Sequence, residues 1–243
     1  MKRTERHHLK ENEVALSVAR ARETFETYRK PIVAGVVALV LVVVAVVGLT
    51  AWRRGSDADA RVLLADAMAV AGAPVAPAPA PGTNAPAPAP GTYPSERAKL
   101  EAALQKFKAA ADAHPSSDPG IAARYHEAAV LTALGRYKEA EQQYRAVVDR
   151  AGAGLYGQMA RLGLANTHAA GGQYDQAIAA FKELSAQKET DLPVDAILMQ
   201  LGRTYLQAGK ADDARKTFTR VTDEFPQSPY ASLATRELAQ LKG

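Results

Sequence analysis

Few side chains in this 243-residue chain have the types and spacing that chemistry requires. The segment Gly152-Ala153-Gly154-Leu155-Tyr156-Gly157 matches G-x-G-x-x-G, the pattern with which a backbone loop approaches a dinucleotide pyrophosphate. That function needs a strand before the loop and a βαβ unit around it. The flanking sequence has helical periodicity instead, so we interpret the segment as a flexible turn between two helices.

The histidines do not form a metal or catalytic cluster in the sequence. His7 and His8 could bind a metal ion, but no third ligand is evident near them. His114 and His126 are isolated. We expect His168 to be a packed, hydrogen-bonded side chain rather than a catalytic group.

Composition and charge exclude further classes of activity. The chain has no cysteine, hence no disulfide, thiolate metal site or cysteine nucleophile. No nucleophile–base pair or paired carboxylates stand out, so we expect no enzymatic activity, no metal and no cofactor. Residues 1–30 carry a net charge of +3 out of +4 for the whole chain, which leaves no basic field for nucleic acid in the remainder.

A 37-residue repeat is the main organising feature of the sequence. Glycines recur with this period, followed by a small residue and an aromatic one. Gly135, Gly172 and Gly209 share one register position, Ala140, Ala177 and Ala214 a second, and Tyr144, Phe181 and Phe218 a third. A fixed period of this length is typical of stacked repeats that bury their apolar faces against each other.

Each repeat is predicted to be a helix hairpin. About a dozen residues with helical periodicity precede each glycine, and a second helical run follows it. Glycine can adopt the left-handed conformation that ends the first helix. The alanine allows the two helices to approach closely, and the aromatic residue fills the space between adjacent hairpins.

These positions resemble the tetratricopeptide repeat family. Units beginning at Ile121, Gln158 and Asp195 place family-typical residues at the small, apolar and aromatic positions, although the tryptophan is missing, two units lack the proline and the period exceeds the usual one. The resemblance implies an all-α fold, a right-handed α-solenoid of hairpins over 121–226. It also implies protein–protein interaction rather than catalysis.

The sequence on both sides of the three units fits the same frame. We expect residues 53–72 and 93–115 to be the two helices of a degenerate first repeat, with Val62, Leu63, Ala65, Ala67 and Met68 as the apolar residues of the first helix. Between them, the Ala/Pro-rich segment 73–92 is interpreted as an insertion in the turn or, alternatively, as a spacer between domains. Residues 228–243 are predicted to form a capping helix that starts with Ser228 and Pro229.

Residues 31–52 form a strongly apolar segment. Its 22 residues carry no charge and 13 of them are Val, Ile or Leu, enough for a helix to cross a bilayer. More Lys and Arg lie before it than after it, which favours a cytoplasmic N-terminus and external repeats. The composition suggests a bacterium, so we expect a single-pass inner-membrane protein with periplasmic repeats.

Residues 1–30 form a basic tail with apolar residues at helical spacing. Val14, Val18, Phe25 and Tyr28 belong to this pattern. The tail is interpreted either as an amphipathic extension at the lipid surface or as a docking helix for a partner.

In tetratricopeptide repeats the first helices of successive hairpins line a concave groove, and the resemblance assigns groove residues here. The side chains at these positions are mainly small, apolar or uncharged polar. The predicted protein-binding residues are Tyr125, Met159, Leu162, Asn166, Met199, Arg203, Leu206 and Gln207. The carboxylate clamp of chaperone-binding members is absent, since its positions hold Tyr125, Ala129, Gly163, Ala196 and Gln200.

The overall layout, a short tail, one anchor and external repeats, resembles the ancillary subunit family of the bacterial Sec translocon. That resemblance implies an adaptor or holdase for exported or envelope proteins near the translocon, with unfolded polypeptide segments as partners. The alternative is a structural scaffold that assembles a division, pilus or secretion complex.

Overall fold

The computed structural model describes residues 3–76, 89–187 and 191–241, with side chains from Lys30 onward except at 32 and 51–54. The described residues form helices and contain no β-strand, so the predicted all-α fold is confirmed. They divide into two compact units, Met1–Gly55 and Ser56–Gly243. Most of the Ala/Pro-rich segment and the side chains of the basic tail, including His7 and His8, lie outside the described residues.

The first unit consists of the N-terminal part of one continuous helix, α1 (Arg3–Ala71). Pro31 lies inside this helix, where it removes one backbone donor. The large apolar side chains described between Val33 and Leu49 are all exposed. From Val33 the helix is long and apolar enough to cross a membrane, judged by its length and composition alone.

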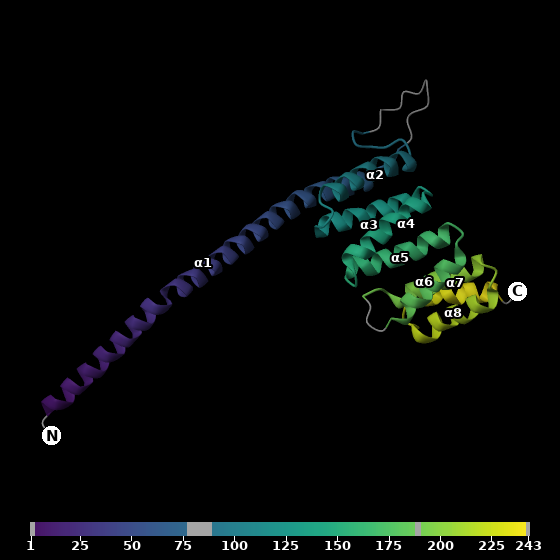
Figure 1. Cartoon of the computed structure of the whole chain (residues 1–243). Coiled ribbons are helices and arrows are strands. Elements are labelled where there is room, and N and C mark those ends of the chain that lie inside the picture. The colour runs from purple at the N-terminus through teal and green to yellow at the C-terminus, as the bar shows by residue number, and fades with distance from the viewer. Residues whose placement is uncertain (1–2, 77–88, 188–190, 242–243) are drawn as a thin grey trace. The chain divides into compact units, whose positions relative to one another are not determined.

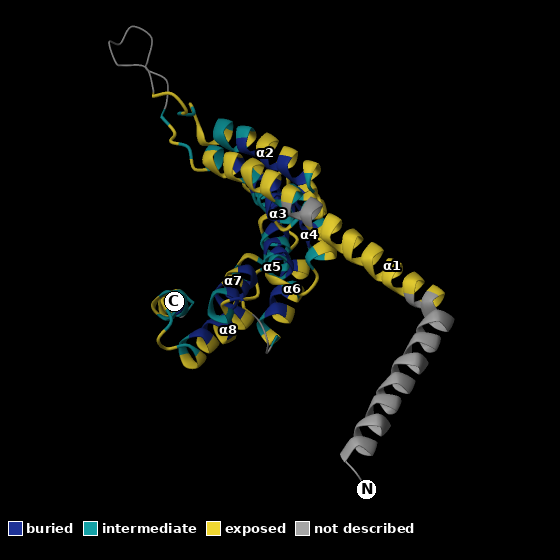
Figure 2. Cartoon of the chain, turned by 90° about the vertical axis from the view of Figure 1, so that its left-hand side faces the viewer, coloured by how far each residue is buried: buried dark blue, intermediate teal, exposed yellow. Residues whose placement is uncertain are grey.

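The second unit is a chain of antiparallel helices (Figure 1). After the end of α1 come α2 (Glu96–Ala113), α3 (Asp118–Ala133), α4 (Tyr137–Ala151), α5 (Leu155–Ala170), α6 (Tyr174–Ala186), α7 (Val194–Gln207), α8 (Ala211–Glu224) and α9 (Ala231–Gln240). From α2 onward, each helix packs against the next in the chain. Burial alternates along these helices, with one side of each turned to the interior (Figure 2).

Three identical turns set the 37-residue period. Gly135, Gly172 and Gly209 have φ of 75°, 75° and 74°. At each turn the glycine N–H donates to the carbonyl three residues earlier, and the next N–H donates to the carbonyl five residues earlier, as in Gly172 to Ala169 (3.1 Å) and Gln173 to His168 (2.8 Å). This is the Schellman motif, which satisfies the last carbonyls of the first helix and reverses the chain.

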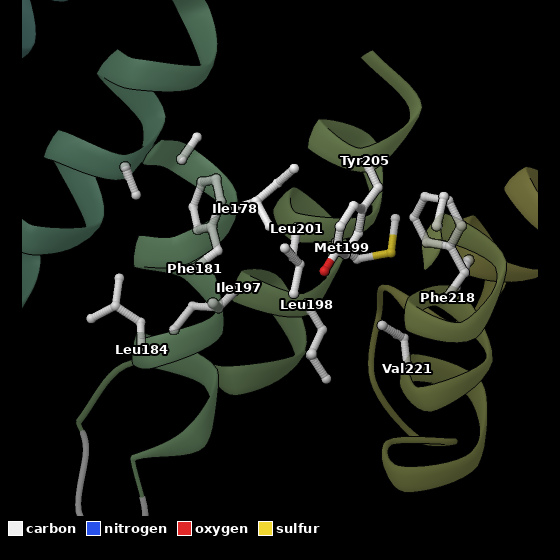
Figure 3. Close-up of a cluster of buried hydrophobic side chains, with 14 of the residues drawn as sticks. Ile178, Phe181, Leu184, Ile197, Leu198, Met199, Leu201, Tyr205, Phe218 and Val221 are labelled. Atoms are coloured by element: carbon white, nitrogen blue, oxygen red, sulfur yellow. The ribbon is translucent and has the colours of Figure 1, made fainter. Parts of the chain in front are cut away.

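The repeat alanines and aromatic residues occupy the interior as predicted. Ala140, Ala177 and Ala214 are each fully buried. The rings one turn later, Phe181 and Phe218, are exposed by only 1% and 0%. They belong to a continuous apolar cluster over α5–α9, part of which is shown in Figure 3.

The first hairpin pairs the end of α1 with α2. The Ser56 hydroxyl lies 2.9 Å from His114 Nδ1, and Lys106 Nζ donates to Asp66 Oδ2 at 2.7 Å. Beyond the helices, the Ala76 N–H donates to the Tyr93 carbonyl at 3.0 Å. The two segments therefore run antiparallel, and the described ends of the Ala/Pro-rich connection meet at a single bridge.

Two local expectations need correction. In the last part of α1, the buried side is formed by Ala60 and Ala67, with Leu64 and Val70 partly buried, whereas Val62, Leu63, Ala65 and Met68 are exposed. The last helix begins at Ala231 rather than at Ser228. The Ser228 hydroxyl instead donates to Asp195 Oδ2 (2.6 Å) and accepts from the Tyr230 N–H (3.0 Å), so it fixes the turn before α9 to the start of α7.

Candidate protein-binding face

Helices α3, α5 and α7 place the predicted groove residues side by side. These are the first helices of three successive hairpins, and α5 contacts both α3 and α7. The Schellman turns fix each of these helices to its partner, so residues 37 positions apart occupy equivalent places. We call the surface made by Tyr125, Met159, Leu162, Asn166, Arg203, Leu206 and Gln207 the candidate binding face.

The apolar members of this face are partly buried. Met159, Leu162 and Leu206 pack their inner sides against the large apolar cluster and keep part of their surface open. A flexible thioether beside branched side chains suits apolar ligands of varied shape.

Met199 does not belong to the accessible surface. Its side chain is exposed by only 2% and lies in the apolar cluster with Phe218 and Val221 of α8 (Figure 3). The repeat register assigned Met199 to the groove, but in this structure it offers no surface to a partner.

The polar side chains of this face differ in whether they interact with other residues of the chain. Arg203 Nε lies 3.4 Å from Glu237 Oε1 of α9, a long contact between exposed groups. Asn166 and Gln207 have no hydrogen-bonding partner among the residues that the structure describes. Because each amide has both donors and an acceptor, the two side chains can pair with the backbone of a bound polypeptide.

Tyr125 is the centre of an aromatic cluster that the sequence pattern only partly revealed. Its ring centroid lies 5.7 Å from that of Tyr144 and 5.9 Å from that of Tyr156. Burial raises the pKa of both Tyr125 and Tyr144. Tyr156 belongs to the glycine motif in the sequence, and its place beside Tyr125 depends on the turn between α4 and α5.

That turn contains the G-x-G-x-x-G segment, and its geometry is that of a helix–helix connection. Gly152 ends α4 with φ 55°, and Gly154 precedes α5. A Cβ at Gly157 would lie 2.1 Å from the Gly152 carbonyl oxygen, so the third glycine is needed for close packing. The strand that a dinucleotide site needs is not there, because α4 precedes the turn.

His168 is buried as expected, with 7% exposure, and its Nδ1 contacts the Gln173 side chain across the Schellman turn. Among the residues that the structure describes, no cluster of His, Asp and Glu could hold a metal ion.

A polar network lies between α2, α3 and α4. Arg124 donates to Asp112 Oδ1 at 2.8 Å and to Gln143 Oε1 at 2.8 Å, and it lies 3.4 Å from Glu127 Oε2. Glu127 is exposed by only 3%, and burial raises its pKa against the opposing attraction of Arg124. Arg124 and Glu127 belong to α3, Asp112 to α2 and Gln143 to α4, so the network joins three helices and we interpret it as structural.

Comparison with known proteins supports one family. The tetratricopeptide repeat family model matches residues 127–191, 162–229 and 199–240. No curated protein matches the sequence.

Solved structures resemble the chain in fold. The repeats of a putative kinesin light chain from Podosopora anserina are 17% identical, cover 59% of this chain and 77% of that one, and superpose with a TM-score of 0.52. A tetratricopeptide repeat protein from Parabacteroides merdae is 18% identical, covers 60% and 54%, and has a TM-score of 0.47. The repeated Schellman turns, the buried alanines and the three family-model matches together identify residues 127–240 as tetratricopeptide repeats, a protein-interaction module.

Proposed function

We propose that the candidate binding face holds an extended segment of another polypeptide. The observation that carries this proposal is the combination of half-buried Met159, Leu162 and Leu206 with the amides of Asn166 and Gln207, which have no hydrogen-bonding partner among the described residues. Apolar side chains of the segment would pack on the first group, and its backbone would bond to the second. No recognition of charge is needed, which suits a binder of varied apolar sequences.

The same proposal places the repeats outside the inner membrane, anchored by residues 31–52. One apolar helix of sufficient length and the excess of Lys and Arg before it support this arrangement. With this layout we propose an adaptor or holdase for exported or envelope proteins near the Sec translocon. We assign it no catalytic role.

The test is photo-crosslinking from the full chain in cells. A photoreactive residue at exposed Gln207 should capture polypeptides, whereas one at exposed Gln176 on α6, a second helix of its hairpin, is the matched control. Capture of translocon subunits or of many exported chains from 207 would support the adaptor. A single dominant partner would favour the alternative function, a structural scaffold. Equal capture of polypeptides from position 176 would contradict the proposal for the candidate binding face.

Location is tested separately by protease treatment of spheroplasts. External repeats should be digested while cytoplasmic controls survive. If the repeats were protected from the protease, the proposed orientation would be wrong, whereas the proposal for the candidate binding face would be unaffected.

A further inference from the structure

The last part of α1 presents an apolar face to solvent on the side away from α2. Ala60 and Ala67 are 1% and 0% exposed and pack in the first hairpin. At 100° per residue, Ala58, Val62, Ala65 and Ala69 lie on the opposite side of the helix, and all four are exposed, Val62 by 70%. We call these four residues the outer face of α1.

The spacing of the outer face is that of a coiled-coil seam. Its residues are separated by four, three and four positions, the alternation that keeps apolar side chains facing a partner helix. Ala58 and Ala65 take one seam position of the heptad, and Val62 and Ala69 take the other.

Charged residues flank the seam in a complementary way. Arg61 precedes Val62 and Asp66 follows Ala65, five positions apart. In a parallel, in-register pair of identical helices, side chains at these two flanking positions face each other across the seam. Arg61 of each copy would then meet Asp66 of the other.

Arg61 is available for such a pair, and Asp66 keeps one carboxylate oxygen available. Arg61 is exposed and forms no ion pair with the residues that the structure describes. Asp66 Oδ2 accepts from Lys106 of α2 at 2.7 Å, with side-chain exposures of 53% and 52%, which leaves the other carboxylate oxygen open.

We infer that the outer face of α1 binds the same face of a second copy of this chain as a parallel two-stranded coiled coil. The seam is short and made of Ala and Val, so the helices approach closely and the association is modest. The Arg61–Asp66 pairs fix register and direction. This pairing involves no residue of the candidate binding face.

The absence of native cysteine allows a direct test in the full chain. Single substitutions Val62→Cys, Ala65→Cys and Ala69→Cys, oxidised in membranes, should each give a disulfide-linked dimer, because parallel seam positions face their own copies. Leu63→Cys, one residue off the seam and 37% exposed, is the matched control. We expect at least about fivefold more dimer at the seam positions.

A charge exchange tests the pairing independently of the cysteines. Arg61→Asp should weaken dimerisation about tenfold by placing like charges together, and the double exchange Arg61→Asp with Asp66→Arg should restore it. Lys106→Ala, which removes only the contact within one copy, should not weaken dimerisation. The inference would be overturned by any of three results. These are equal crosslinking at positions 62 and 63, failure of the double exchange to restore the dimer, or a monomeric mass of the unmodified chain in light scattering.

Discussion

The N-terminal and C-terminal repeats share one hairpin geometry but have different interiors. Between α3 and α5 the interior is a small cluster of Ala128, Tyr144, Val147 and Ala160, with a polar network around Arg124 nearby. Between α5 and α9 it is one continuous apolar cluster that includes Phe181, Phe218 and Met199. The repeated turns therefore determine the shape of the solenoid. The composition of the interior determines how the free energy of unfolding is distributed along the repeats.

The largest expected effect comes from removing a ring in the apolar half. Phe218→Ala should destabilise the repeats by about 3–5 kcal/mol, because the ring is fully buried and its loss leaves a cavity. Hydrogen exchange of the full chain in detergent, followed by mass spectrometry, should show lost protection in α7–α9 first. Equal loss of protection in α3 and α4 would contradict separate interiors.

A smaller effect should follow from adding one methyl group in the same half. A Cβ at Gly202 would lie 2.4 Å from the Phe218 ring, whereas the equivalent positions Ala128 and Ala165 already carry a methyl group. Gly202→Ala should cost about 1–3 kcal/mol through overpacking, measured by urea denaturation. Ala165→Gly is the matched control and should cost less, about 0.5–1 kcal/mol.

The turns should respond alike in both halves. Gly172→Ala should destabilise by about 1 kcal/mol, since φ is 75° and an added Cβ meets nothing within 4 Å, so the cost is purely that of the backbone conformation. Gly135→Ala and Gly209→Ala should match it within error in the same denaturation experiment. A marked difference among the three would show that the interiors do influence the turns.

The smallest effect concerns the polar network. Burial raises the folded pKa of Glu127, so its contribution to stability is greatest below its ordinary pKa of 4.5 and falls as the pH rises through the folded value. Glu127→Gln should therefore be as stable as the parent at pH 7, or more stable by less than about 1 kcal/mol. The reason is that Arg124 keeps its hydrogen bonds to Asp112 and Gln143 in the variant. The difference should shrink as the pH is lowered through 4.5, and loss of stability at pH 7 would contradict this sign.

The repeat hairpins could be predicted from the sequence because glycine, alanine and an aromatic residue recur in one register, each for a local reason. The buried side of α1 could not, because Val62, Leu63, Leu64, Met68 and Val70 place apolar residues around the whole helix. Only contact with α2 selects Leu64 and Val70. Likewise, register alone assigned Met199 to the groove, whereas its burial depends on how α7, α8 and α9 pack together.

The bridge between Val75 and Tyr93 has a practical consequence. Both described ends of the Ala/Pro-rich connection meet at this bridge, and each doubling of a flexible loop costs only about 0.6 kcal/mol in general. A fluorescent protein or an epitope inserted there should leave the helices on either side in place. This connection is therefore a suitable insertion site for labelling the protein in living cells.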